Sequence, residues 1–123
     1  MSNIVVLFEV KPTKEGMKRY LDLAVMLKPL LSGFDGFIRA ERFSSLNEEG
    51  KLLSMNIWTD EAAVERWRNT VEHRMSQQEG REKLFESYKI TVCSALREYT
   101  DTDRAEAPAD SNEYFAEGKV YPG

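Results

Sequence analysis

Near the N-terminus lies an apolar stretch, Asn3-Ile4-Val5-Val6-Leu7-Phe8-Glu9-Val10, whose residues are mostly β-branched or aromatic. Residues of these types favour a β-strand, in which successive side chains point to opposite faces. One face then carries Ile4, Val6, Phe8 and Val10, and the other carries Val5 and Leu7 beside Glu9. A strand that is apolar on both faces is covered on both sides in the folded protein.

Two helices are predicted from apolar residues that recur every three or four positions. Thr13 is placed to cap the first, and Pro29 is expected to limit its regular part. Thr59 or Asp60 is placed to cap the second, which we expect to end before Gly80. The apolar stripes are Met17, Tyr20, Ala24, Leu27 and Leu31 in the first helix, and Ala63, Val64, Trp67, Thr70 and Val71 in the second.

Three further strands are predicted from alternating residues. Residues 37–45 form a half-polar strand, and a polar hairpin loop at residues 47–50 joins it to a strand at residues 51–59. Leu84, Phe85 and Tyr88 indicate a short helical turn that leads into a last strand, residues 88–99.

The element order is strand, helix, strand, strand, helix, strand. It predicts an α+β, ferredoxin-like βαββαβ fold with a four-stranded antiparallel sheet and both helices on one side. The other face of the sheet also needs a cover, because it carries apolar side chains and the chain offers no third long helix. A second subunit is the natural cover, so we expect a homodimer. The apolar residues of that face are Val5, Leu7, Leu53, Met55 and Ile57.

The chain divides into a domain at residues 1–100 and a C-terminal tail at residues 101–123. Residues 100–110 have the composition of a linker. The segment beyond them contains four large apolar residues, Tyr114, Phe115, Val120 and Tyr121. We expect this tail to pack on the domain or on the dimer partner.

Composition excludes several classes of protein. There are 17 Lys and Arg against 21 Asp and Glu, with no basic cluster, which argues against a nucleic-acid partner. Because the chain has one Cys and one His, it cannot form an intramolecular disulfide, a three-His metal site or a cysteine-rich zinc site. Lys28 interrupts the apolar stretch at residues 21–31, and no signal-peptide pattern is present, so we expect a cytoplasmic protein that does not associate with membranes.

Several spaced motifs stand in a recognisable order. They are Val5-Val6-Leu7-Phe8-Glu9-Val10-Lys11-Pro12, Gly33-Phe34-Asp35-Gly36-Phe37, Ile57-Trp58-Thr59-Asp60-Glu61-Ala62-Ala63, Trp67-Arg68-Asn69 with Glu72-His73-Arg74, and Gln77 with Gly80-Arg81, Phe85 and Tyr88. Together they resemble the antibiotic biosynthesis monooxygenase family of the dimeric α/β-barrel superfamily. The resemblance covers residues 3–100 and implies that fold and a homodimer.

What the resemblance implies about activity is broader. The family includes enzymes that oxygenate polycyclic aromatics or hydroquinones without a metal or flavin, and it includes heme-degrading enzymes. The heme-degrading branch uses an Asn in the first strand, a Trp early in the second helix and an axial His ten residues later. Trp67 matches that Trp, but Phe8 and Gln77 stand at the other two positions. Heme degradation is therefore the weaker implication.

The candidate catalytic residues are His73, Asn56 and Arg74. His73 suits proton abstraction because an unperturbed imidazole has a pKa of about 6.5; the alternative is a helix-end histidine bonded to a neighbouring group. Asn56 shares a strand face with Trp58, where a buried amide needs hydrogen-bond partners. Arg74 lies about 20° from Trp67 around an ideal helix, and it faces inward only if the helix continues beyond Thr70.

Trp58, Trp67, Tyr20 and Tyr88 are the candidate substrate-binding residues. They form either an aromatic wall for a flat ligand or ordinary core. No glycine-rich phosphate loop is present, so no nucleotide or flavin cofactor is expected. These observations predict a cofactor-independent monooxygenase that acts on an aromatic or quinol-like small molecule. A non-catalytic homodimer that binds a small ligand is the alternative, and heme binding is a third.

Overall fold

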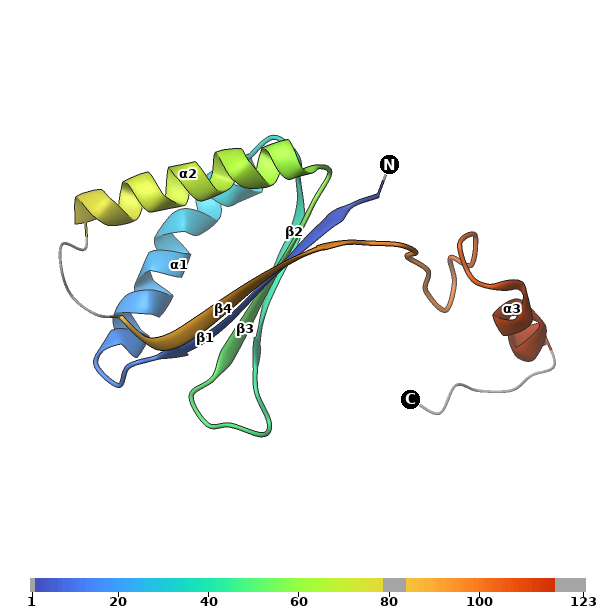
Figure 1. Cartoon of the computed structure of the whole chain (residues 1–123), viewed down its shortest axis with the longest axis horizontal. Coiled ribbons are helices and arrows are strands. Elements are labelled where there is room, and N and C mark those ends of the chain that lie inside the picture. The colour runs from blue at the N-terminus through green and yellow to red at the C-terminus, as the bar shows by residue number, and fades with distance from the viewer. Residues whose placement is uncertain (1, 79–83, 117–123) are drawn as a thin grey trace.

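The computed structural model describes the backbone of residues 2–78 and 84–116, and the side chains of these residues except 73–78 and 115. The elements are β1 (Ile4–Pro12), α1 (Gly16–Ser32), β2 (Phe37–Ser44), β3 (Leu52–Trp58), α2 (Glu61–Gln78), β4 (Phe85–Ser94) and α3 (Ala109–Ala116). The strands form one antiparallel sheet in the order β2-β3-β1-β4, with α1 and α2 on the same face (Figure 1). The predicted ferredoxin-like α+β fold is confirmed.

Both predicted capping residues bond to the start of a long helix, although the N-cap position of α1 is Glu15 and not Thr13. The Thr13 hydroxyl accepts a hydrogen bond from the backbone N–H of Gly16 at 2.9 Å. The Asp60 carboxylate accepts one from the backbone N–H of Ala63 at 2.8 Å. Each bond satisfies a donor that the first turn of a helix leaves without a partner.

Pro29 does not limit α1, which continues through it to Ser32, so this expectation is wrong. A proline inside a helix leaves the carbonyl four residues earlier without its donor. Here that carbonyl belongs to Val25, whose side chain is mostly exposed, so water can replace the missing donor.

The start of β4 differs from the prediction of a helical turn. Phe85 is already strand and pairs with Pro12 across a register shift. The carbonyl of Leu84 accepts a hydrogen bond from the backbone N–H of Thr13 at 2.8 Å. This pairing with a distant segment overrides the local helical pattern.

The end of β4 also differs, because the strand stops at Ser94 and not at Tyr99. Ser94 pairs with Ile4, the first residue of β1, and Ala95 makes one more backbone bond to Asn3. A strand cannot pair beyond the end of its neighbour, so the length of β1 sets the end of β4.

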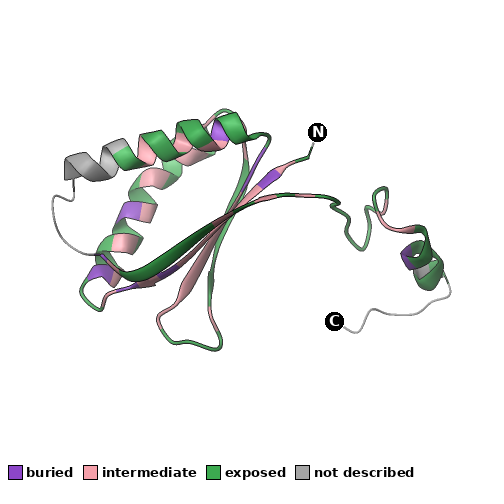
Figure 2. Cartoon of the chain, viewed as in Figure 1, coloured by how far each residue is buried: buried purple, intermediate pink, exposed green. Residues whose placement is uncertain are grey.

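The register assigns the strand residues to the two faces of the sheet. Phe8 contacts the ring of Tyr20 in α1, so Phe8 and the residues paired with it face the helices. Val10 and Trp58 on this helix face are each only 1% exposed, and the buried positions line the space beneath α1 and α2 (Figure 2). The helix face of the three strands β1, β3 and β4 comprises Ile4, Val6, Phe8, Val10, Leu52, Ser54, Asn56, Trp58, Tyr88, Ile90, Val92 and Ser94.

The opposite face of the sheet, called the open face below, is apolar along its centre. It carries the five residues expected there, Val5, Leu7, Leu53, Met55 and Ile57. Ile57 is buried and the other four are half-buried, although α1 and α2 both lie on the far side of the sheet.

Beyond β4 the chain leaves the sheet as an extended segment that ends in α3. Figure 1 shows α3 standing apart from the sheet, on the side opposite to α1 and α2. What residues 101–123 pack on stays a prediction. Among the helices of the described residues, none combines the length and hydropathy that a membrane crossing requires.

Candidate functional site

Two aromatic clusters lie on the helix face, one at each end of the sheet. The first, called the tryptophan cluster, consists of Phe34, Phe37, Trp58 and Trp67. The rings of Trp58 and Trp67 are 6.1 Å apart, and Trp58 packs with Ile4 and Ala63 in the core. At 1% exposure Trp58 has no surface left for a ligand, which favours the packing role that the sequence left open.

The second cluster, called the tyrosine cluster, consists of Phe8, Tyr20, Phe85 and Tyr88, and its contacting ring pairs have centroids 5.5 to 6.4 Å apart. The Tyr88 side chain is 62% exposed even though it contacts two of the other rings. Tyr20 and Tyr88 therefore belong to one cluster, in which both contact Phe8 and Phe85, and Tyr88 leaves the cluster open to solvent.

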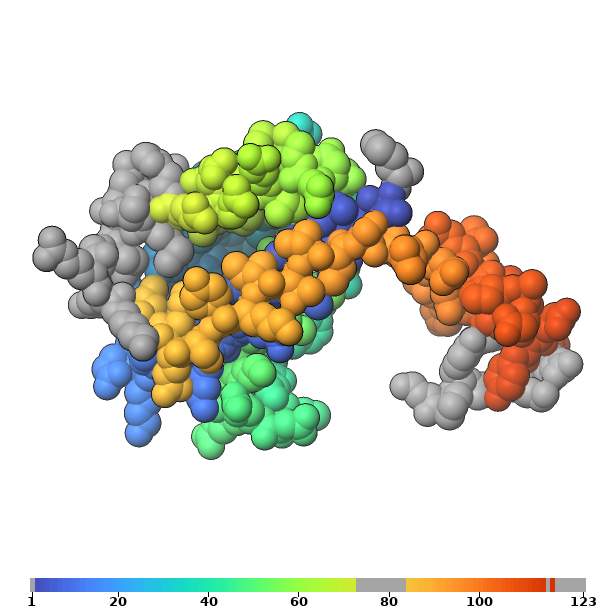
Figure 3. Space-filling view, in the orientation of Figure 1, coloured from blue at the N-terminus to red at the C-terminus, as the bar shows by residue number. Residues whose placement is uncertain are grey.

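Next to Tyr88, the helix face of the edge strand β4 is open to solvent. Ile90 and Val92 are 55% and 50% exposed, and they pair with Phe8 and Val6 of β1. Figure 3 shows that the molecule is hollowed between α2 and β4, where atoms of deeper elements are visible. We call this region the helix-side groove, and the register places Val6, Asn56, Tyr88, Ile90 and Val92 on the face of the sheet beneath it. Its apolar floor suits a small hydrophobic molecule.

Asn56 is the polar group on the floor of the groove. It pairs with Val6 on one side and Ala40 on the other, and it lies two residues from Trp58 on the same face, as predicted. Its side chain is half-buried, and within the described part of the chain its amide has no hydrogen-bond partner. An amide held in this position can donate to or accept from an oxygen of a bound molecule.

Arg42 is a residue that the sequence reasoning missed. Its guanidinium lies 5.6 Å from the centroid of the Tyr20 ring, and no ion pair involves it among the described residues. It pairs with Ser54 of β3, which lies two residues before Asn56 on the same face of the sheet. The period of two placed Arg42 on this face, but only the register shows that it lies next to the tyrosine cluster.

His73 and Arg74 belong to α2, whose backbone continues to Gln78. Their side chains, and that of Gln77, lie outside the described residues, so their direction stays a prediction. In the described part of the chain, no three His, Cys, Asp or Glu side chains come together in a way that could hold a metal ion.

Comparison with known proteins places this chain in a family. A family model described as antibiotic biosynthesis monooxygenase matches residues 3–79. The chain belongs to the antibiotic biosynthesis monooxygenase family. A relative named jasmonate monooxygenase ABM, from Pyricularia oryzae, is 40% identical over 87 residues, which are 71% of this chain and 40% of the relative. The match thus spans less than half the length of that relative.

Solved structures of other proteins share the fold. Rv0793 from Mycobacterium tuberculosis superposes with a TM-score of 0.68 and 19% identity, over 80% of this chain and 100% of that chain. SnoaB, a cofactor-independent oxygenase from Streptomyces nogalater, has a TM-score of 0.62 and 11% identity, over 80% of this chain and 97% of that chain. At these identities the likeness establishes the fold alone.

Proposed function

We propose that this chain is a cofactor-independent monooxygenase that oxidises an aromatic or quinol-like small molecule in the helix-side groove. The observation that carries the proposal is the Asn56 amide, which has no hydrogen-bond partner among the described residues and lies beside Val6 of β1 on the helix face. Membership of a monooxygenase family supports the reaction class.

The substrate itself supplies the electrons in this reaction. A base removes a proton from an acidic C–H or O–H group, and the resulting carbanion transfers electrons to O2. A carbon–oxygen bond forms, the O–O bond breaks, and one oxygen atom stays on the substrate as a carbonyl. The second oxygen leaves as water with the two protons that the substrate lost. No external reductant is needed, because the substrate loses four electrons in all, which is the number that O2 accepts when one of its oxygen atoms becomes the carbonyl oxygen and the other becomes water.

The chain's residues have separate tasks in this proposal. His73, or a water molecule bound to it, removes the proton. Asn56, with Arg74, stabilises the oxyanion that forms, since donors fixed beforehand cost no reorganisation during the reaction. Tyr20 and Tyr88 hold the flat ring and exclude solvent. Trp58 and Trp67 support the groove from the core.

A second substrate class is favoured by Arg42 and by the jasmonate monooxygenase relative. Jasmonate is a cyclopentanone that carries a carboxylate, and arginine, which in the case of Arg42 makes no ion pair with the described residues, is the residue type that binds a carboxylate. Hydroxylation of an unactivated carbon needs two electrons from outside the substrate. An acidic substrate of this kind would therefore be oxidised only when a two-electron donor is supplied.

We also propose that the active form is a homodimer that buries the open face of the sheet. Its apolar centre is flanked by the ion pairs Glu9–Lys51 and Arg39–Glu41, whose atoms are 3.7 and 3.4 Å apart. An apolar centre with a charged rim is the usual anatomy of a protein interface. A two-fold axis lets the same patch serve both subunits.

Oxygen uptake by chelator-treated protein tests the proposed reaction. The panel contains hydroquinones, anthrone, and jasmonic acid with and without NADH as electron donor, each against heat-denatured protein. Asn56→Leu and His73→Ala should each lower the rate by about 10²-fold or more. Asn69→Leu is the matched control, because Asn69 is exposed on α2.

Three outcomes oppose the proposal and point elsewhere. Equal rates for the Asn56 and Asn69 variants would remove Asn56 from the mechanism. No uptake above the control, together with saturable binding of a panel compound, would indicate the non-catalytic ligand-binding dimer. A Soret band on heme titration that disappears in His73→Ala would indicate a heme protein.

A further inference from the structure

Ser54 is a polar residue of the helix face to which the proposed reaction gives no task. It pairs with Phe8 of β1 on one side and with Arg42 of β2 on the other. Its side chain is half-buried, and it makes no hydrogen bond to the described residues. Among the described residues, no side-chain oxygen or nitrogen is both fully buried and without a partner, so the Ser54 hydroxyl retains accessible surface. A ligand can therefore reach this donor.

Arg42 supplies a positive charge beside this hydroxyl. Directly paired residues on one face of a sheet have Cβ atoms about 4.5–5.5 Å apart, so Arg42 and Ser54 are close enough to share a ligand. The Arg42 guanidinium also lies 5.6 Å from the centroid of the Tyr20 ring, a contact that holds the charge on the helix face. A guanidinium and a hydroxyl side by side are two donors suited to one carboxylate.

The sheet places no carboxylate near Arg42 that would neutralise it. Glu9 and Glu41 lie on the open face, where they form ion pairs with Lys51 and Arg39. Among the paired strand residues of the described chain, Arg42 is the one with a charged side chain on the helix face. Its charge is thus left for a ligand.

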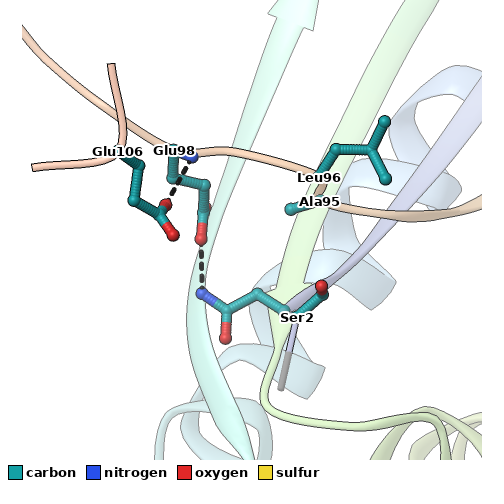
Figure 4. A pocket seen from close by; sticks show the side chains of 6 residues that line it. Ser2, Ala95, Leu96, Glu98 and Glu106 are labelled. Carbon is teal, nitrogen blue, oxygen red and sulfur yellow. Dashed lines mark hydrogen bonds between the residues drawn. The ribbon is translucent and has the colours of Figure 1, made fainter. Parts of the chain in front are cut away.

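A polar hollow at the other end of the sheet does not suit an anion. It lies beside the start of β1, has a volume of about 220 Å³ and is shown in Figure 4. The carboxylates of Glu98 and Glu106 line it. The Asn3 amide already donates to Glu98 at 2.8 Å, and the backbone N–H of Glu98 already donates to Glu106 at 2.7 Å. An acidic molecule is therefore repelled from this hollow and attracted to Arg42.

The spacing between Ser54 and Asn56 limits the size of the acid. The two residues stand two positions apart on one face of β3, so their Cα atoms are about 7 Å apart. In the proposed reaction Asn56 binds the oxygen at the reacting end of the substrate. The carboxylate must then lie about 7 Å from that oxygen, which is roughly the span of one six-membered ring with a short acidic side chain.

We propose that Arg42 and Ser54 form a carboxylate subsite, and that the substrate is a cyclic acid. Its hydroxyl or ketone oxygen reaches Asn56 while its carboxylate binds the subsite. This proposal rests on the proposed function, because it takes Asn56 as the contact of the reacting oxygen. It joins the flat ring held by the tyrosine cluster and the anion held by Arg42 in one molecule.

Two isomers of one acid test the spacing. 4-Hydroxyphenylacetic acid has its hydroxyl across the ring from the acidic side chain, whereas 2-hydroxyphenylacetic acid has it next to that chain. The isomers have the same atoms and the same charge. Isothermal titration under nitrogen, which prevents turnover, should give a Kd at least about threefold lower for the 4-isomer. Equal Kd values, tighter binding of the 2-isomer, or no binding of either would overturn the proposal.

Variants assign this binding to individual residues. Ser54→Ala and Arg42→Met should each raise the Kd of 4-hydroxyphenylacetic acid about 3- to 5-fold. Neither should change the Kd of 4-ethylphenol, which keeps the ring and hydroxyl but lacks the carboxylate. Asn56→Leu should remove the preference for the 4-isomer. Ser94→Ala is the matched control, because Ser94 is an exposed serine of the helix face at the other end of the sheet.

The variants and the oxygen-uptake panel together separate the subsite from the reaction. Equal losses for the acid and for 4-ethylphenol in both subsite variants, or an equal loss in Ser94→Ala, would overturn the subsite. An active oxygenase that binds the two isomers equally would also overturn the subsite and leave the reaction standing. The predicted isomer preference without oxygen uptake would support the subsite and overturn the oxygenase.

Discussion

The two aromatic clusters are built from the same kinds of residue but differ in burial. The tryptophan cluster lies beneath the start of α2, and its centre at Trp58 is almost completely buried. The tyrosine cluster lies at the other end of the sheet, beside an edge strand, and Tyr88 is mostly exposed. An aromatic residue on the helix face can therefore contact a ligand only where no helix covers it.

Replacing Trp58 gives the largest expected difference between the clusters. Trp58→Ala should lower the free energy of unfolding by about 3–5 kcal/mol, because it removes a large side chain from a closed core. Tyr88→Ala should lower it by about 1 kcal/mol or less, since most of that side chain is already in water. Urea unfolding followed by circular dichroism measures both. Similar losses for the two variants would contradict the assignment of one cluster to the core.

Gly36 sharpens the comparison, because it lets α2 approach the tryptophan cluster. Its φ is +90°, and an added Cβ would lie 2.5 Å from Cβ of Ala63. Gly50 is the matched control, with φ of +81° and open space around it. Gly50→Ala should cost about 1–2 kcal/mol for the backbone alone. Gly36→Ala should cost about 1–3 kcal/mol more because of the overlap. Equal decreases in melting temperature for Gly36→Ala and Gly50→Ala would show that α2 can move away from the added Cβ without loss of stability.

Tyr88→Leu tests the open cluster as a ligand contact. Losing the aromatic ring should raise the Kd of a flat aromatic ligand about 2- to 10-fold. Isothermal titration with the best substrate of the panel gives this value. Phe37→Leu, in the tryptophan cluster, is the comparison variant and should leave the Kd unchanged. The account fails here if the Phe37 variant loses as much affinity as the Tyr88 variant.

Arg42→Met has the smallest expected effect and concerns only charged ligands. Affinity for jasmonic acid should fall about 3- to 5-fold, the loss expected for an exposed ion pair. Affinity for a neutral hydroquinone should not change. A loss of equal size for both ligands would mean that Arg42 acts by holding Tyr20 in place.

Local periodicity predicted the fold and the faces on which several candidate residues lie. The period of two placed Asn56 with Trp58, and the helical stripes placed Tyr20 and Trp67 toward the sheet, as the structure confirms. Properties that depend on pairing between distant segments could not be predicted in this way. The start of β4 at Phe85 and the position of Arg42 beside the tyrosine cluster both follow from register.

The burial of these residues could not be predicted from the sequence either. Trp58 and Tyr88 both follow a period of two on the helix face, and nothing in their local pattern separates them. The difference arises because α2 crosses above one end of the sheet and leaves the β4 edge uncovered (Figure 1).

The central claim is that ligands bind at Asn56 and the tyrosine cluster, and not at Trp58. An NMR titration of ¹⁵N-labelled protein with 1,4-naphthohydroquinone under nitrogen tests it, because the absence of oxygen prevents turnover. We predict shifts of the Asn56 side-chain amide and of the backbone amides of Tyr88 and Ile90, while the Trp58 indole N–H signal stays in place. A shifting Trp58 indole signal beside an unchanged Asn56 amide would contradict the account.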